Sequence, residues 1–106
     1  MSTKWRRYEV LAPLRFNDGR KVPEEWLGEA IFEIIDHFGA VSFETQRIEG
    51  HWMHEGVHYK DDLSRILVDL PDTQKNRKWM KAFKAKWKKR LEQLELWMIS
   101  YRIDLE

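Results

Sequence analysis

The densest chemical pattern in the sequence is a run of basic residues between positions 75 and 90. No acid interrupts its nine lysines and arginines: Lys75, Arg77, Lys78, Lys81, Lys84, Lys86, Lys88, Lys89 and Arg90. On a helix, Lys78, Lys81, Lys84 and Lys88 would form a basic ridge that can hold phosphates, because neutralised backbone charge drives sequence-independent nucleic-acid binding. Such a helix can also meet an acidic partner or lie on anionic lipid.

The preceding part of the chain has the opposite charge, which favours a simpler explanation of the basic run. Five acids and no base occupy positions 24–36: Glu24, Glu25, Glu29, Glu33 and Asp36. Neighbouring helices made from these two stretches would complement each other within one molecule. The chain has 19 basic and 18 acidic residues and a net charge of +1, which is not typical of a nucleic-acid-binding domain. We therefore expect a solvated helix face, and only weak, salt-sensitive binding of nucleic acid.

Three histidines, His51, His54 and His58, lie within eight residues. Neutral imidazole suits zinc, copper and nickel. On a regular strand, however, His51 and His54 point to opposite faces. A metal site would need the turn at Glu55-Gly56 to bring His54 and His58 together, and no His-Glu-x-x-His pattern is present. We therefore interpret the cluster as a polar hairpin tip and assign no metal.

The sequence contains no pattern of a nucleophilic or nucleotide-binding enzyme. It has no cysteine, no serine in a Gly-x-Ser-x-Gly context and no glycine-rich phosphate loop. We therefore assign no catalytic residue and no cofactor. The lack of cysteine fits a reducing cytoplasm, and no apolar run reaches the roughly 18 residues of a membrane span. We expect a cytoplasmic protein that does not enter a membrane.

Hydrophobic periodicity predicts the elements that must position these residues. The length of 106 residues predicts a single domain over residues 1–106. Alternation predicts strands over residues 8–16, 41–53, 59–70 and 96–105. Apolar residues at steps of three and four predict two helices. The first begins at Pro23 and ends at Gly39, and the second is capped by Asp72 or Thr73.

This β-α-β-β-α-β order resembles the ferredoxin-like superfold over nearly the whole chain. The resemblance implies an α+β fold, in which two helices cover one face of a four-stranded antiparallel sheet. Gly50-His51-Trp52 also resembles a Gly-x-Trp motif that follows the second strand in small uncharacterised bacterial domains. Because the superfold hosts enzymes, metal carriers, RNA binders and regulators, it implies no particular function.

Strand alternation predicts which side chains the helices cover. The covered residues would be Val10, Ala12, Leu14, Phe43, Ile66, Val68, Leu70, Trp97, Ile99 and Tyr101. The open face would present four apolar residues, Leu11, Ile48, Leu67 and Met98, among charged residues that include Glu44, Arg65, Asp69 and Arg102. This arrangement is typical of an interface core with a polar rim, and equally of an ordinary wet sheet face. A bulge at Pro13 or Gly50 would swap the faces.

We therefore predict a small cytoplasmic binding or regulatory domain that acts through a protein interface as a homodimer. An alternative is a dimeric enzyme whose site is built from Glu44, Arg65, Asp69 and Arg102, since arginine binds anionic substrates bidentately. The same residues can equally be ordinary cross-strand ion pairs. A third possibility is weak nucleic-acid binding through the second helix.

Overall fold

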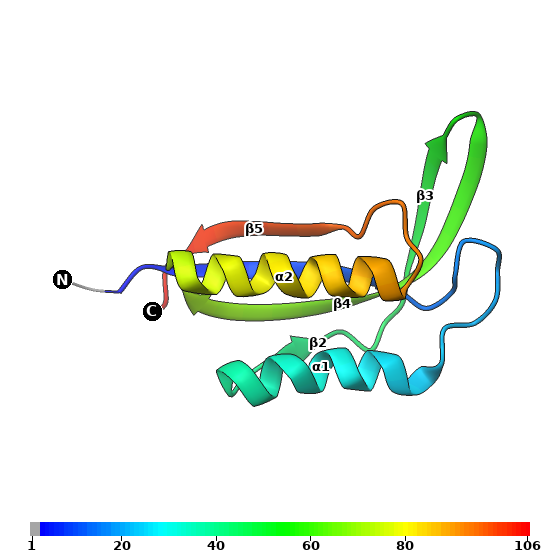
Figure 1. The fold of residues 1–106 in the computed structure, drawn as a ribbon. Helices are drawn as coiled ribbons and strands as arrows, with labels where there is room; N and C mark the ends of the chain where they lie inside the picture. The colour runs from blue at the N-terminus through cyan, green and yellow to red at the C-terminus, as the bar shows by residue number, and fades with distance from the viewer. Residues whose placement is uncertain (1–2) are drawn as a thin grey trace.

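The chain folds into two helices and one antiparallel sheet, which a computed structural model describes for residues 3–106. Its elements, in chain order, are β1 (Trp5–Pro13), α1 (Glu24–Phe38), β2 (Ser42–Phe43), β3 (Ile48–His54), β4 (Val57–Pro71), α2 (Gln74–Arg90) and β5 (Met98–Ile103) (Figure 1). None of the helices in this range is both long and apolar enough to cross a membrane.

Strand β4 is the centre of the sheet. The strand order is β2–β4–β1–β5, and β3 also pairs with β4. The second half of β4, from Leu63 to Pro71, pairs with β1. Its first half, from Val57 to Leu63, pairs with β3. This β3–β4 hairpin projects from the body of the molecule as an arm (Figure 1).

The strand predicted over residues 41–53 is broken in two. Ser42 and Phe43 form β2, Ile48 begins β3, and the intervening residues 44–47 are exposed and polar. Four consecutive polar residues have no apolar partner to alternate with, so they cannot keep one face of a strand against the core. The sheet therefore has five strands where four were predicted, and the β-α-β-β-α-β order is otherwise as expected.

The ends of both helices follow the predicted signals. Pro23 precedes α1, whose first turn contains Glu24 and Glu25. Gly39 ends α1 with a φ of 85°, a conformation that glycine adopts without steric cost. Thr73 caps α2, because its Oγ1 accepts a hydrogen bond from the Asn76 backbone N–H at 3.1 Å.

The core lies between the sheet and the two helices, which cover the same face (Figure 1). Its most completely buried large side chains are Ile34 of α1, Ile66 of β4, Met80 of α2 and Leu96, which precedes β5. The helices and the sheet side therefore contribute two fully enclosed apolar groups each. Residues of β1 and β4 that were predicted to face the helices, such as Val10 and Val68, are buried as expected.

Ion pairs join α1 to the second half of α2, as the opposite charges of these helices predict. Lys86 Nζ lies 2.6 Å from Glu33 Oε1, and Trp87 Nε1 donates to Glu33 Oε2 at 2.7 Å. Arg90 donates to Glu29 of α1 in the same way. Part of the basic charge of α2 is therefore used inside the molecule.

We expect Trp87→Ala to lower the free energy of unfolding by about 3–5 kcal/mol, a large part of the stability of a small domain. Trp87 is 3% exposed and contacts the core through its ring and α1 through its indole nitrogen. Chemical denaturation followed by circular dichroism measures the loss. Phe32→Ala, at a side chain of α1 that is 64% exposed, is the control and should change the free energy of unfolding far less.

Candidate functional site

The candidate site is the face of the sheet that the helices leave uncovered. Side chains directly opposite each other in an antiparallel sheet point to the same side. Glu9 lies opposite both Leu67 and Ile99, and Leu11 lies opposite Arg65. The odd-numbered residues of β1, β4 and β5 therefore share this face, which we call the uncovered face.

Charged side chains on the uncovered face pair with each other. Arg7 Nε and Nη2 donate to the two carboxylate oxygens of Asp69 at 2.8 and 3.0 Å. This bidentate contact raises the pKa of Arg7 above its usual range. Arg65 Nη1 lies 3.3 Å from Glu44 Oε1 and 3.8 Å from Glu9 Oε1. The acids and bases of this face are thus matched within one chain.

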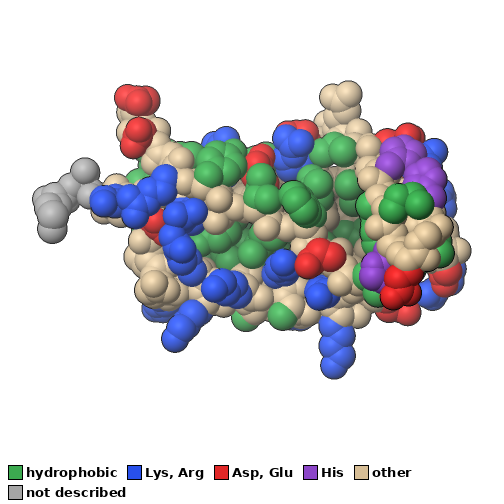
Figure 2. Space-filling model, turned by 90° about the horizontal axis from the view of Figure 1, so that it is seen from above, with side chains coloured by type: hydrophobic (Ala, Val, Ile, Leu, Met, Phe, Trp, Pro, Cys, Tyr) green, Lys and Arg blue, Asp and Glu red, His purple; other side chains and the backbone are tan. Residues whose placement is uncertain are grey.

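Large apolar side chains lie beside these ion pairs and remain in solvent. Trp97 is 59% exposed, Ile99 39% and Tyr101 40%, and we call these three residues the β5 apolar group. Leu11 and Leu67 are partly exposed on the neighbouring strands. Seen from the side of β5, hydrophobic side chains run along the body and basic side chains fringe the border formed by α2 (Figure 2).

The predicted orientation of the last strand was wrong. The β5 apolar group was expected in the core, and Met98 and Arg102 were expected on the open face. Instead, Met98 lies opposite Val10 and packs against the core, while Arg102 lies opposite Arg6 on the helix side. The cause is Leu96, which is 1% exposed and occupies a core position just before the strand. Alternation from Leu96 then turns the even-numbered residues inward.

The other predicted face residues are divided between the body and the arm. Leu11, Arg65, Leu67 and Asp69 lie on the uncovered face, and Glu44 reaches it from the segment between β2 and β3. Ile48 pairs with Leu63 at the root of the arm. The acid–base site predicted from Glu44, Arg65, Asp69 and Arg102 is not assembled, because Arg102 lies on the other side of the sheet.

The basic ridge is only partly neutralised. Lys84 Nζ lies 3.1 Å from Glu95 Oε1, a contact that lowers the pKa of Glu95. Lys78, Lys81 and Lys88 make no ion pair with any residue in the described part of the chain. These three lysines are therefore the part of the predicted ridge whose positive charge is not neutralised by an ion pair within the described residues.

The histidines of the arm form a pair other than the one considered from the sequence. His51 Nδ1 lies 2.9 Å from His58 Nε2, and His51 Nε2 lies 2.7 Å from Glu49 Oε2. His54 is not part of this contact. Within residues 3–106 there is no group of three or more potential ligands placed to hold a metal ion. The arrangement is a hydrogen-bonded surface cluster at the end of the molecule that carries the arm (Figure 2).

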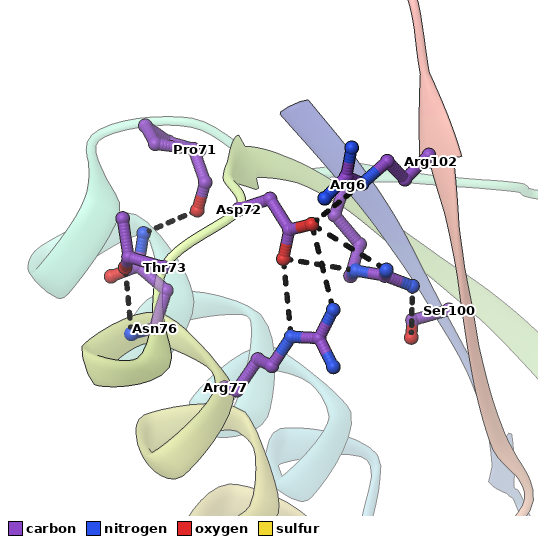
Figure 3. A network of polar contacts seen from close by, with 8 residues as sticks. All are labelled: Arg6, Pro71, Asp72, Thr73, Asn76, Arg77, Ser100 and Arg102. Atoms are coloured by element: carbon purple, nitrogen blue, oxygen red, sulfur yellow. Dashed lines mark hydrogen bonds and ion pairs between the residues drawn. The ribbon is translucent and has the colours of Figure 1, made fainter. Parts of the chain in front are cut away.

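Asp72 is the centre of a polar network that the sequence did not reveal. Its side chain is 3% exposed and accepts hydrogen bonds from Nε of Arg6, Arg77 and Arg102 at 3.1, 3.1 and 3.0 Å (Figure 3). Hydrogen bonds from Arg77 and Arg6 hold the pKa of Asp72 well below its usual range. Asp72 was considered only as a helix cap. The three arginines come from β1, α2 and β5, so no local spacing connects them.

Comparison with known proteins identifies the fold. No family model matches the chain, and no curated protein is a significant match. A phage SAM lyase solved with S-methyl-5'-thioadenosine superposes with a TM-score of 0.69 at 12% identity, over 99% of this chain and 93% of that one. CutA1 from Oryza sativa has a TM-score of 0.67 at 15% identity, over 99% and 84% of the two chains.

A phage SAM lyase in its apo state superposes with a TM-score of 0.63 at 13% identity, over 100% of this chain and 94% of the other. These identities are low, so the comparisons concern the fold. Together with the order of helices and strands, they confirm the α+β class predicted from the sequence. The chain has the ferredoxin-like fold.

We expect Asp72→Asn to lower the midpoint of thermal unfolding at about pH 7, and the difference from wild type to shrink at about pH 3. The folded state holds the pKa of Asp72 below the unfolded value, so the carboxylate stabilises the fold above the unfolded pKa. This contribution is lost as pH falls. Circular dichroism melts across this range measure it, with the exposed Asp104→Asn as control. A difference that stays constant with pH would contradict the assignment.

Proposed function

We propose that this protein is a small binding or regulatory domain that works as a homodimer, joined through the uncovered face of its sheet. The observation that carries the proposal is the exposure of the β5 apolar group beside Leu11 and Leu67. Both helices lie on the opposite face, so nothing in the described chain covers these side chains. Burying apolar surface against a second copy gains about 25 cal/mol per Å².

The charges of the uncovered face also suit burial. An interface that leaves a charge unpaired is costly, whereas a charge that is already hydrogen-bonded loses less on desolvation. Arg7 and Asp69 satisfy each other bidentately, and Arg65 has carboxylates on two sides. A second copy can therefore dock without finding new ion partners.

The arm extends the same surface. Continued alternation along β4 puts Tyr59 on the side of Arg65, and Trp52 lies directly opposite Tyr59. Their rings stack with centroids 4.3 Å apart, and Trp52 Nε1 donates to Asp61 at 2.7 Å. A two-fold interface uses the same patch of both copies, so the arm of one copy could contact the uncovered face of the other.

Leu67→Glu and Ile99→Glu should each shift the protein toward monomer at concentrations where wild type is dimeric. Each places a carboxylate at the centre of the apolar part of the proposed interface, where a buried unpaired charge costs several kcal/mol. Sedimentation velocity over a concentration series measures the shift.

Phe32→Glu is the matched control, because Phe32 is a 64% exposed apolar residue on α1, away from the uncovered face. It should sediment as wild type does. A wild-type protein that remains monomeric throughout the series overturns the proposal. A dimer that persists in both face variants would place the contact elsewhere, such as on the free edge of β5.

A second candidate function is enzymatic. The observation that favours it is the likeness to phage SAM lyase over nearly the full length of both chains, in a structure that holds S-methyl-5'-thioadenosine. The corresponding activity would break the bond between the sulfur and the amino-acid chain of SAM. It would release S-methyl-5'-thioadenosine, and the four-carbon chain would leave as a lactone closed by its own carboxylate or as an alkene after loss of a proton.

Incubating the purified protein with SAM and separating the products by liquid chromatography tests this activity. Release of S-methyl-5'-thioadenosine above the rate without protein would support the lyase. A rate equal to that of SAM alone would exclude it, and would leave self-association to be decided by sedimentation.

A further inference from the structure

A large apolar cavity lies on the other side of the sheet, between its helix-facing surface and the two helices. Its volume is about 400 Å³, within the range of roughly 300–1,000 Å³ that small-molecule sites occupy. Protein interiors are normally close-packed, with few voids larger than a water molecule. A cavity of this size in a chain of 106 residues therefore needs an explanation.

The cavity exists because small residues stand where larger ones would fill the core. Ala12 of β1, Ala30 of α1 and Ser64 of β4 all line it. Large rings line it as well, and they include Trp26 of α1 and Trp87 of α2. These rings can contact a flat molecule on its faces and edges.

The two indoles are held in place from outside the cavity. The Arg90 guanidinium lies over both rings, 4.2 Å from the Trp26 centroid and 4.7 Å from the Trp87 centroid. Glu29 and Glu33 of α1 bind Arg90 and the Trp87 indole nitrogen, respectively. Contacts outside the cavity therefore fix the positions of both indoles, whether or not the cavity is filled.

One polar group inside the cavity is poorly satisfied. Ser64 of β4 is 5% exposed. Its one hydrogen bond, from Oγ to the Glu44 carbonyl oxygen, is 3.5 Å long, the weak limit for such a contact. A buried hydroxyl without a good partner costs free energy, so the site favours a ligand with a polar group at this point.

The rim of the cavity has a surplus of unpaired positive charge. Its acids Asp62 and Glu44 are paired with Arg15 at 3.5 Å and with Arg65 at 3.3 Å. Lys21 and Arg47 also line the cavity and make no ion pair with any residue between positions 3 and 106, and the same is true of the acid Glu24. Two free cations thus stand against one free carboxylate.

We propose that the cavity is a binding site for a small aromatic anion, a flat ring system that carries one carboxylate or sulfonate group. The rings would lie against Trp26 and Trp87 where these side chains line the cavity, and the anionic group would meet Lys21 and Arg47 at the rim. Glu44 belongs both to the rim of this site and to the uncovered face, but the cavity itself lies between the sheet and the helices, so the proposal does not rest on the dimer.

The probe for this site is 8-anilinonaphthalene-1-sulfonate, an aromatic anion whose fluorescence rises in apolar surroundings. Wild type should bind it saturably at one site per chain. Ala30→Phe, which fills the cavity, should weaken binding about tenfold or more, equivalent to about 1.4 kcal/mol. Ala85→Phe adds the same ring at an exposed position of α2 and should leave binding unchanged.

A comparison of an anionic and a neutral probe tests whether the site selects an anion. The double variant Lys21→Glu, Arg47→Glu should weaken binding of the sulfonate about fivefold. It should not affect N-phenyl-1-naphthylamine, which has the same rings without the anionic group. Equal effects on both probes, or none on either, would overturn the assignment of an anion.

Indole N–H signals in two-dimensional NMR keep the test independent of whether the filled variant folds. In wild type, the sulfonate should shift the signals of Trp26 and Trp87. Shifts confined to Trp52 and Trp97, which lie outside the cavity, would overturn the proposal. So would undiminished binding to an Ala30→Phe variant whose thermal unfolding matches wild type.

Discussion

The fold depends on one nearly buried carboxylate. Asp72 follows the central strand directly and is held by arginines from β1, α2 and β5 (Figure 3). A charge removed from water must be paired, and removing its partners is far more costly than losing an exposed ion pair. The Asp72 backbone N–H also donates to the Lys4 carbonyl oxygen at 2.7 Å. Side chain and backbone together align the ends of three strands and the beginning of α2.

At the other end of α2, surface ion pairs and not a buried network hold the elements together. There α1 is joined to α2 by charged side chains at the surface of the helix pair, while the space beneath is left open to form the cavity. One end of the molecule is thus fixed by a dense polar network, and the other is spanned by ion pairs over a hollow. Ligand sites often occur where packing between elements is incomplete in this way.

Much of the fold could be predicted from the sequence because its signals are local. Pro23 and Gly39 mark the ends of α1 through the conformations of their own backbone, and Thr73 marks the start of α2 through a hydrogen bond of its own side chain. The broken second strand was missed because the predicted strand ran through four polar residues, 44–47, that have no apolar partner. The orientation of β5 was missed because both sets of alternating residues contain apolar groups, and only the burial of Leu96 decides between them.

The candidate site was harder to predict, because local signals cannot show which distant residues come together. Alternation within their own strands predicted that Leu11, Arg65, Leu67 and Asp69 share one face, and the register of β1 and β4 gives them the same side. The cavity and the Asp72 network are built from residues far apart in the chain, and their small or charged side chains have no periodic pattern. Only the three-dimensional pairing of elements brings them together.

Because β4 is a single strand of 15 residues, the arm and the body share one continuous backbone. The residues of β4 that pair with β3 continue without interruption into the part of the strand that contains the core residues Ile66 and Val68. A molecule bound to the arm would therefore contact the same strand that lies at the centre of the sheet. The strand ends at Pro71, so the backbone that begins in the arm leads directly to Asp72 and the arginines that hold it.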